Sequence, residues 1–200
     1  MAAMYDELLR PNRVFTRSEV LDSPSAVPAE PGVYAWYVDA PPHHVPLDGC
    51  HRSEQGFLLY AGISPKEPSS DGRQSNQNLR KRLRNHYRGN ASGSTLRLTL
   101  GCLLEAELSI RLQPTPSGRL TFGSGEDVLS DWMEAHTRVT WLVHAEPWRV
   151  EHGLIAQLSL PLNLDQNSAH PFHDELSALR RAARSRARGN TTRRALADDC

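Results

Sequence analysis

Two tyrosines, an arginine and a glutamate stand in this sequence in an order suited to phosphodiester chemistry. Tyr34 and Tyr60 each lie in a β-rich run, Arg82 lies in a basic helical segment, and Glu151 begins a later apolar stripe. Hydrolysis of a phosphodiester needs a base for water, a cation for the charge developing on phosphorus, and help for the leaving oxygen. A free tyrosine has a pKa of about 10, so a tyrosine base requires a nearby cation such as Arg82.

The two tyrosines belong to predicted strands. Residues 32–38 are β-rich and bounded by prolines, and residues 57–63 form a second apolar run. We expect these strands to pair as an antiparallel hairpin whose long tip covers residues 41–55, a loop size that often serves recognition. Both tyrosines would then face one side of the sheet.

Helices are predicted for most of the remaining chain. Asn78 is a suitable N-cap for the helix that carries Arg82, and Pro147 suits the first turn of the helix that carries Glu151. Helices are expected over residues 1–14, 79–87, 94–108, 126–136, 147–160 and 172–188. A third strand is expected over 139–143. Loops are expected over 18–31 and 112–125, and the second of these could instead form a small ribbon. The fold class is therefore α/β (α+β), with a small three-stranded, mainly antiparallel sheet, flanking helices and a C-terminal basic helix.

The joint pattern resembles the GIY-YIG nuclease superfamily over roughly residues 32–163. The matching positions are Gly32-Val33-Tyr34, Tyr60-Ala61-Gly62, Arg82, His86, Glu151 and Asn163. The long spacings between the tyrosines, and between Arg82 and Glu151, place it nearest the type II restriction-endonuclease branch. The second motif has Ala61 where the family name has isoleucine, at a position expected to pack.

The resemblance implies a metal-dependent DNA endonuclease with a defined set of site residues. Tyr34 would bind or deprotonate the attacking water with help from Tyr60, and Arg82 would contact the scissile phosphate. His86 lies one helical turn after Arg82 and could reach that phosphate or Tyr34. Glu151 would be the sole protein ligand of one divalent ion, Mg²⁺ or Mn²⁺, which accepts few protein ligands.

Asn163 completes the implied catalytic set, by holding the metal or a tyrosine, although Pro161-Leu162-Asn163 could equally be a helix stop. The other positions also have ordinary alternatives, since strand tyrosines are often structural and a glutamate can simply favour a helix dipole. Two further functions stay open. One is a DNA-binding module that does not cleave, and the other is a structure- or damage-specific nuclease of repair or phage defence.

Charge distribution supports DNA as the partner although the formal net charge is zero. Arginines crowd the helix of Arg82, and Arg80, Arg84 and Arg88 are expected to contact DNA, with Arg80 in reserve for the role of Arg82. A second arginine cluster occupies residues 180–194. One site cuts one strand, so a homodimer is a reasonable expectation.

Composition predicts a cytoplasmic protein without a membrane segment. The chain has 200 residues, 38% of them hydrophobic, and its three cysteines form no CxxC pair. No apolar run approaches the roughly 18 residues of a spanning helix, and the first residues lack a signal-peptide pattern. We expect an N-terminal helix and linker over 1–31, a nuclease-like domain over 32–165, and a basic helix with a disordered tail over 166–200.

Overall fold

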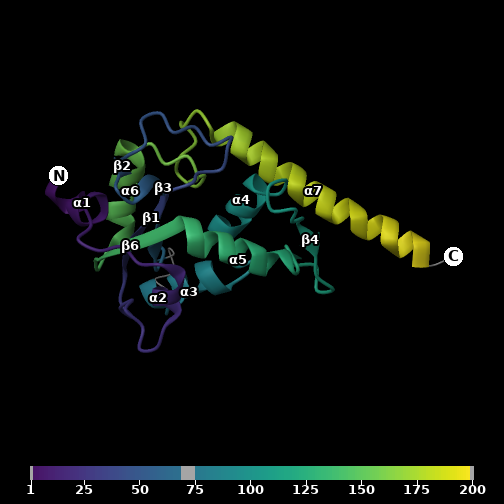
Figure 1. Ribbon diagram of the computed structural model, residues 1–200, viewed down its shortest axis with the longest axis horizontal. Helices are drawn as coiled ribbons and strands as arrows, with labels where there is room; N and C mark the ends of the chain where they lie inside the picture. Colours follow the sequence, from purple (N-terminus) through teal and green to yellow (C-terminus); the bar gives the residue numbers. More distant parts are fainter. Residues whose placement is uncertain (1, 69–74, 199–200) are drawn as a thin grey trace.

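The computed structural model describes residues 2–68 and 75–198. Its centre is an antiparallel four-stranded sheet in the order β2-β3-β1-β6 (Figure 1). The strands are β1 (Gly32–Val38), β2 (Arg52–Ser53), β3 (Gly56–Ser64) and β6 (Thr137–Val143). The three expected strands are present, and β2 is an addition from the tip of the hairpin. Sequence patterns missed β2 because two polar residues carry no alternation of apolar and polar side chains.

Helices cover both faces of the sheet (Figure 1). On one face, α6 packs on β1 and β3, and α1 packs on β6. On the other face, α3 packs on β1 and β3, α5 packs on β6, and α2 packs on α3 and α5. The bounds are α1 (Ala2–Leu9), α2 (Arg17–Leu21), α3 (Leu79–Arg88), α5 (Gly125–His136) and α6 (Pro147–Gln157).

A second group of elements extends the molecule beyond the sheet. Helix α7 (His173–Asp198) packs its first half along α4 (Thr95–Leu103), and its C-terminal end projects away from the body of the molecule (Figure 1). The short ribbon of β4 (Gln113–Pro114) and β5 (Leu120–Thr121) lies beside α7. Among the described residues, no helix combines the length and apolarity that a membrane crossing requires.

Several segments differ from the sequence prediction. Helices α1 and α6 end at Leu9 and Gln157, before the ends of the expected helices 1–14 and 147–160. The expected loop 18–31 contains most of α2, which a Thr16–Glu19 capping box stabilises. Helix α4 ends at Leu103 and turns follow it, so it is shorter than the expected 94–108. Helix α7 continues to Asp198, past Gly189 where disorder was predicted, and the stretch 180–188 before that glycine is rich in alanine and arginine, which favour helix.

Strand β1 is buried along its whole length because both faces of the sheet are covered. Val33, Ala35 and Tyr37 pack into the apolar cluster below α1 and α6, whereas Tyr34 and Trp36 pack toward α3. Alternation along a strand therefore sends the two tyrosines of β1 to opposite faces. Only Tyr34 reaches the side that carries Arg82.

Candidate active site

Tyr34 and Tyr60 face the same side of the sheet, as predicted, with ring centroids 6.4 Å apart. They are diagonal neighbours, because Tyr34 pairs with Gly62 and Tyr60 pairs with Trp36. A Cβ added at Gly62 would lie 2.5 Å from the Tyr34 hydroxyl oxygen. The glycine of the second motif thus provides the space in which the Tyr34 ring lies across β3.

The Tyr34 hydroxyl joins two side chains of α3. The Nε–H of Arg82 donates to the Tyr34 oxygen at 3.2 Å, and His86 Nε2 lies 2.9 Å from it. The other ring nitrogen, His86 Nδ1, lies 2.7 Å from the Ser94 hydroxyl. Both His86 nitrogens therefore have hydroxyl partners, and a neutral imidazole can donate through one and accept through the other.

Burial keeps this network uncharged apart from Arg82. Burial raises the pKa of Tyr34, and neighbouring Tyr60 raises it further, while Arg82 opposes both effects. Burial lowers the pKa of His86 well below its ordinary value, and the charges of Arg82 and Arg97 add to the decrease. The phenol and the imidazole are consequently both neutral, and one ring nitrogen of His86 can accept a hydrogen bond.

Two anchors hold α3 so that Arg82 and His86 face Tyr34. Asn78 caps the helix, as predicted, by accepting from the backbone N–H of Lys81 at 2.9 Å. The fully buried Arg97 pairs with Glu126 at 2.8 Å and also donates to the main-chain oxygen of His86 at 3.4 Å.

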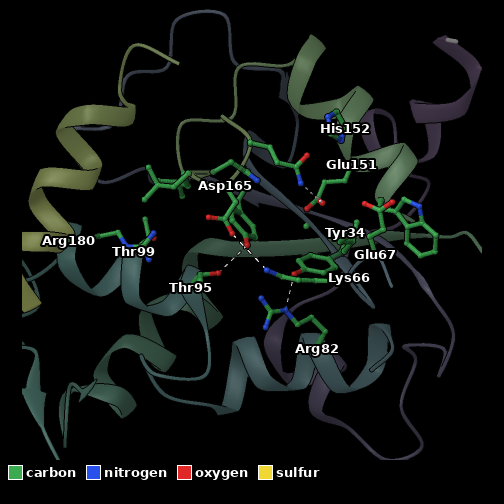
Figure 2. Close-up of a pocket in the computed structure, with 18 residues that line it drawn as sticks. Tyr34, Lys66, Glu67, Arg82, Thr95, Thr99, Glu151, His152, Asp165 and Arg180 are labelled. Carbon is green, nitrogen blue, oxygen red and sulfur yellow. Dashed lines mark hydrogen bonds and ion pairs between the residues drawn. The ribbon is translucent and has the colours of Figure 1, made fainter. Parts of the chain in front are cut away.

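Glu151 approaches the tyrosines from α6, on the opposite side of the pocket from α3 (Figure 2). Its Oε2 accepts a hydrogen bond of 3.4 Å from Gln166. Burial raises the pKa of Glu151 to about 7, with a further rise from Asp165, although Lys66, Gln166 and Arg82 lower it. A half-buried carboxylate with so high a pKa would gain from additional positive charge.

Asn163 binds the backbone next to Tyr60. Its Oδ1 accepts from the Ala61 N–H at 2.9 Å, and its Nδ2 donates to the Ala61 oxygen at 2.8 Å. Both ends of the amide are therefore occupied by one residue of β3. The Tyr60 hydroxyl lies 3.4 Å from the Thr95 hydroxyl at the start of α4.

These residues share one open pocket of about 300 Å³ (Figure 2). Five of the six residues predicted as catalytic line it, and the sixth, His86, lies behind Tyr34 and is fully buried. Further lining residues that the sequence did not single out include Lys66, Thr95, Thr99, Asp165 and Arg180. Asp165 and Lys66 lie shortly after Asn163 and the second tyrosine motif, but no sequence signal distinguished them from other polar loop residues.

The arginines predicted to bind DNA lie on α3 but outside this pocket. Arg80 Nε donates to the Val27 main-chain oxygen at 2.7 Å, and Arg84 Nη2 donates to that of Leu21 at 3.1 Å. Arg88 is exposed at the end of the helix. One guanidinium nitrogen of Arg80 and one of Arg84 thus bind the segment before β1, and the contact of these arginines with DNA stays a prediction.

Residues 32–182 match the family model described as the GIY-YIG catalytic domain. A search of curated proteins and a search of solved structures found no match. The matched range begins at β1, includes every residue that lines the pocket, and ends within α7. Because it covers more than half of the chain, the chain belongs to the GIY-YIG family and is an endonuclease, a hydrolase of phosphodiester bonds.

Proposed function

We propose that this chain is a divalent-metal-dependent DNA endonuclease of the restriction type, and that the pocket of Tyr34, Arg82 and Glu151 holds the scissile phosphate. The observation that carries this proposal is the convergence of those three side chains, from β1, α3 and α6, around one open cavity. A base, a cation and a carboxylate then surround the position of a single phosphate.

Tyr34 takes the proton of the attacking water in this proposal. Arg82 donates to the Tyr34 oxygen, and His86 is neutral and within 2.9 Å of it. We assign the His86 proton to Nδ1, which donates to Ser94, so that Nε2 accepts the hydroxyl proton of Tyr34. As Tyr34 takes a proton from water, its own proton moves toward His86 Nε2, so that no buried phenolate has to persist. Burial, Arg82 and Arg97 disfavour the imidazolium that forms, and the negative charge that develops on the phosphate compensates for it.

Arg82 stabilises the charge that develops on the phosphate. Its planar guanidinium offers several donors in a fork that suits phosphate oxygens. The Nε–H already orients Tyr34, so the outer nitrogens are the groups we assign to the substrate. Arg82 thereby fixes the position of Tyr34 relative to the phosphate, and in-line attack requires such a fixed arrangement.

Glu151 suits a divalent ion of the kind on which GIY-YIG nucleases generally depend. Within residues 2–68 and 75–198 there is no group of three or more acidic, histidine or cysteine side chains that could hold a metal. A single carboxylate fits Mg²⁺, which retains several waters and binds few protein groups, and Mn²⁺ is the alternative ion. A bound ion would supply positive charge to the phosphate oxygens as the bond breaks.

Tyr60 and Asn163 position the rest of the site. Asn163 fixes the Ala61 backbone through two hydrogen bonds, and this holds the adjoining Tyr60 hydroxyl at the pocket wall. We therefore assign Asn163 to positioning and Tyr60 to assistance at the phosphate. Arg80, Arg84 and Arg88 would bind phosphates outside the pocket through the donors that they do not use internally.

Cleavage of supercoiled plasmid tests the proposal. Wild type should cut with Mg²⁺ or Mn²⁺, should not cut in chelator, and should give discrete bands as a restriction enzyme does. Glu151→Ala should abolish cutting, whereas Glu54→Ala, which changes an exposed turn residue away from the pocket, should not. One pocket cuts one strand, so linear product requires two protomers or two encounters, and a rate that rises with the square of protein concentration would support a homodimer. Absence of cutting by pure wild type would contradict the proposal.

A further inference from the structure

Two buried arginines of this protein differ in how their charge is satisfied. Arg97 is fully buried, and Glu126 together with main-chain oxygens accepts its hydrogen bonds. Arg180 is only 8% exposed, and its Nε is buried with no hydrogen-bond partner. In the part of the chain that the structure describes, no residue forms a hydrogen bond or ion pair with the Arg180 side chain. An unpaired buried charge is costly, so it indicates a missing anion.

Arg180 lines the same pocket as Tyr34, Arg82 and Glu151. It projects from α7 toward Thr99, whereas Arg82 approaches from α3 on a different side of the pocket (Figure 2). Burial lowers the pKa of Arg180 and the charge of Asp165 opposes that decrease, but Asp165 forms no ion pair with Arg180, because it is exposed and pairs with Lys66 at 4.0 Å. The pocket therefore contains two arginines from separate helices, and neither is paired with a carboxylate of the described chain.

The surface beyond Arg180 is also basic. A second hollow shares Arg180 and Asp165 with the catalytic pocket and continues along α7 past Arg181 and Arg184. Arg181 is exposed and Arg184 is half-buried. Burial and the charge of Arg184 lower the pKa of Arg180. A row of phosphates would compensate the buried charge of Arg180 and would also reduce the repulsion between Arg180 and Arg184.

We propose that Arg180 binds a second phosphate of the DNA strand being cut, adjacent to the scissile one, and that Arg181 and Arg184 carry the strand away along α7. This proposal rests on the proposed function, since it assumes that the scissile phosphate lies at Arg82. The guanidinium fork of Arg180 would bind two oxygens of the adjacent phosphate. Two fixed phosphates define the direction of the strand through the pocket, which a single contact cannot do.

Binding of DNA that carries one neutral methylphosphonate tests the proposal. The duplexes would span the cleavage site that is mapped on plasmid, and the methylphosphonate would be moved one phosphate at a time. Binding would be measured with the Glu151→Ala protein in chelator, so that no DNA is cut during the measurement. We expect substitution at one neighbour of the scissile phosphate to weaken binding by about tenfold. Arg180→Gln should weaken binding of unmodified DNA by a similar factor, and the same methylphosphonate should then have no further effect.

Arg119→Gln is the matched control, because Arg119 is an exposed arginine outside both hollows. It should retain the full methylphosphonate effect at the same position. Arg180→Gln should also decrease the slope of log binding constant against log salt by about one, the value expected for a single phosphate contact. An unchanged slope and an unchanged methylphosphonate effect would overturn the proposal.

Thermal stability separates this role from ordinary packing of α7. Arg180→Met removes the unpaired charge and keeps an unbranched apolar stem, so it should raise Tm in the absence of DNA while it weakens DNA binding. A decrease in Tm with DNA affinity unchanged would assign Arg180 to packing and overturn the proposal.

If wild type cuts DNA but Arg180→Gln binds DNA as wild type does, this inference fails alone. If wild type neither binds nor cuts DNA, the proposed function fails with it.

Discussion

Replacement of Glu151 by glutamine should stabilise the protein at alkaline pH although it abolishes cleavage. Burial and Asp165 raise the pKa of this carboxyl from 4.5 to about 7. The full shift corresponds to about 3 kcal/mol, and screening by water in the open pocket reduces it to roughly 1.5 kcal/mol. We therefore expect Glu151→Gln to raise the free energy of unfolding at pH 8 in chelator by about 1.5 kcal/mol.

The sign follows from the direction of the shift. A pKa that is higher in the folded than in the unfolded protein means that the folded state holds the proton more tightly. The associated stability is complete below pH 4.5 and is lost as pH rises through about 7. Wild type and Glu151→Gln should thus unfold alike near pH 4.5 and diverge between that pH and 8. For a protein of this length the difference at pH 8 corresponds to roughly 3–6 °C in Tm.

Thermal unfolding followed by circular dichroism would measure this difference, with and without Mg²⁺. Added Mg²⁺ should raise the Tm of wild type at pH 8, because the ion compensates the carboxylate, and should not raise that of Glu151→Gln. Glu54→Gln, in the exposed turn before β3, is the control and should follow wild type. The cleavage rate should fall about tenfold per pH unit below about 7, as protons compete with the ion at Glu151. A Glu151→Gln protein that is no more stable than wild type at pH 8 would refute the reasoning.

Three other substitutions have defined outcomes. Gly62→Ala places a methyl group 2.5 Å from the Tyr34 oxygen, and we expect kcat to fall about 100-fold with the circular dichroism spectrum retained, since misplacement by about 1 Å has that effect. Arg97→Leu leaves the partly buried carboxylate of Glu126 without its cation, and urea unfolding should report a loss of about 3 kcal/mol. Asn163→Ala removes both partners of the Ala61 backbone, and it should cost about 1–3 kcal/mol by the same assay, whereas Asn163→Asp should keep only the bond from the Ala61 N–H.

Sequence patterns predicted the elements whose residues encode them locally. The first strand was predicted with its observed limits, and Asn78 was predicted as the cap of α3. The alternation of side chains along a strand, together with the expected hairpin pairing, predicted that Tyr34 and Tyr60 share one face. The position of His86 one helical turn after Arg82 left two partners open, the phosphate and Tyr34, and the structure places His86 beside Tyr34.

The remaining features depend on contacts between distant segments. The amide of Asn163 binds Ala61 across the edge of β3, and the sequence shows only that Asn163 follows a proline. Arg180 appeared as one of many tail arginines, and its burial results from the packing of α7 against α4. The raised pKa of Glu151 likewise depends on its burial in the folded protein and on Asp165, which a loop after α6 places near it. Such features require the tertiary structure because no periodicity or motif encodes them.

The cleavage rate of Tyr34→Phe tests the central claim most directly. The change removes only the hydroxyl that contacts Arg82 and His86, and it should be measured by single-turnover cleavage of a mapped duplex with DNA affinity determined on the same samples. Tyr37→Phe is the control from the same strand, since the Tyr37 hydroxyl donates to the Leu8 oxygen on the opposite face of the sheet. We predict that Tyr34→Phe lowers the rate by about 10²–10⁴-fold at unchanged affinity and that Tyr37→Phe cuts as wild type does. A Tyr34→Phe rate within a few-fold of wild type would contradict the assignment of the proton transfer to Tyr34.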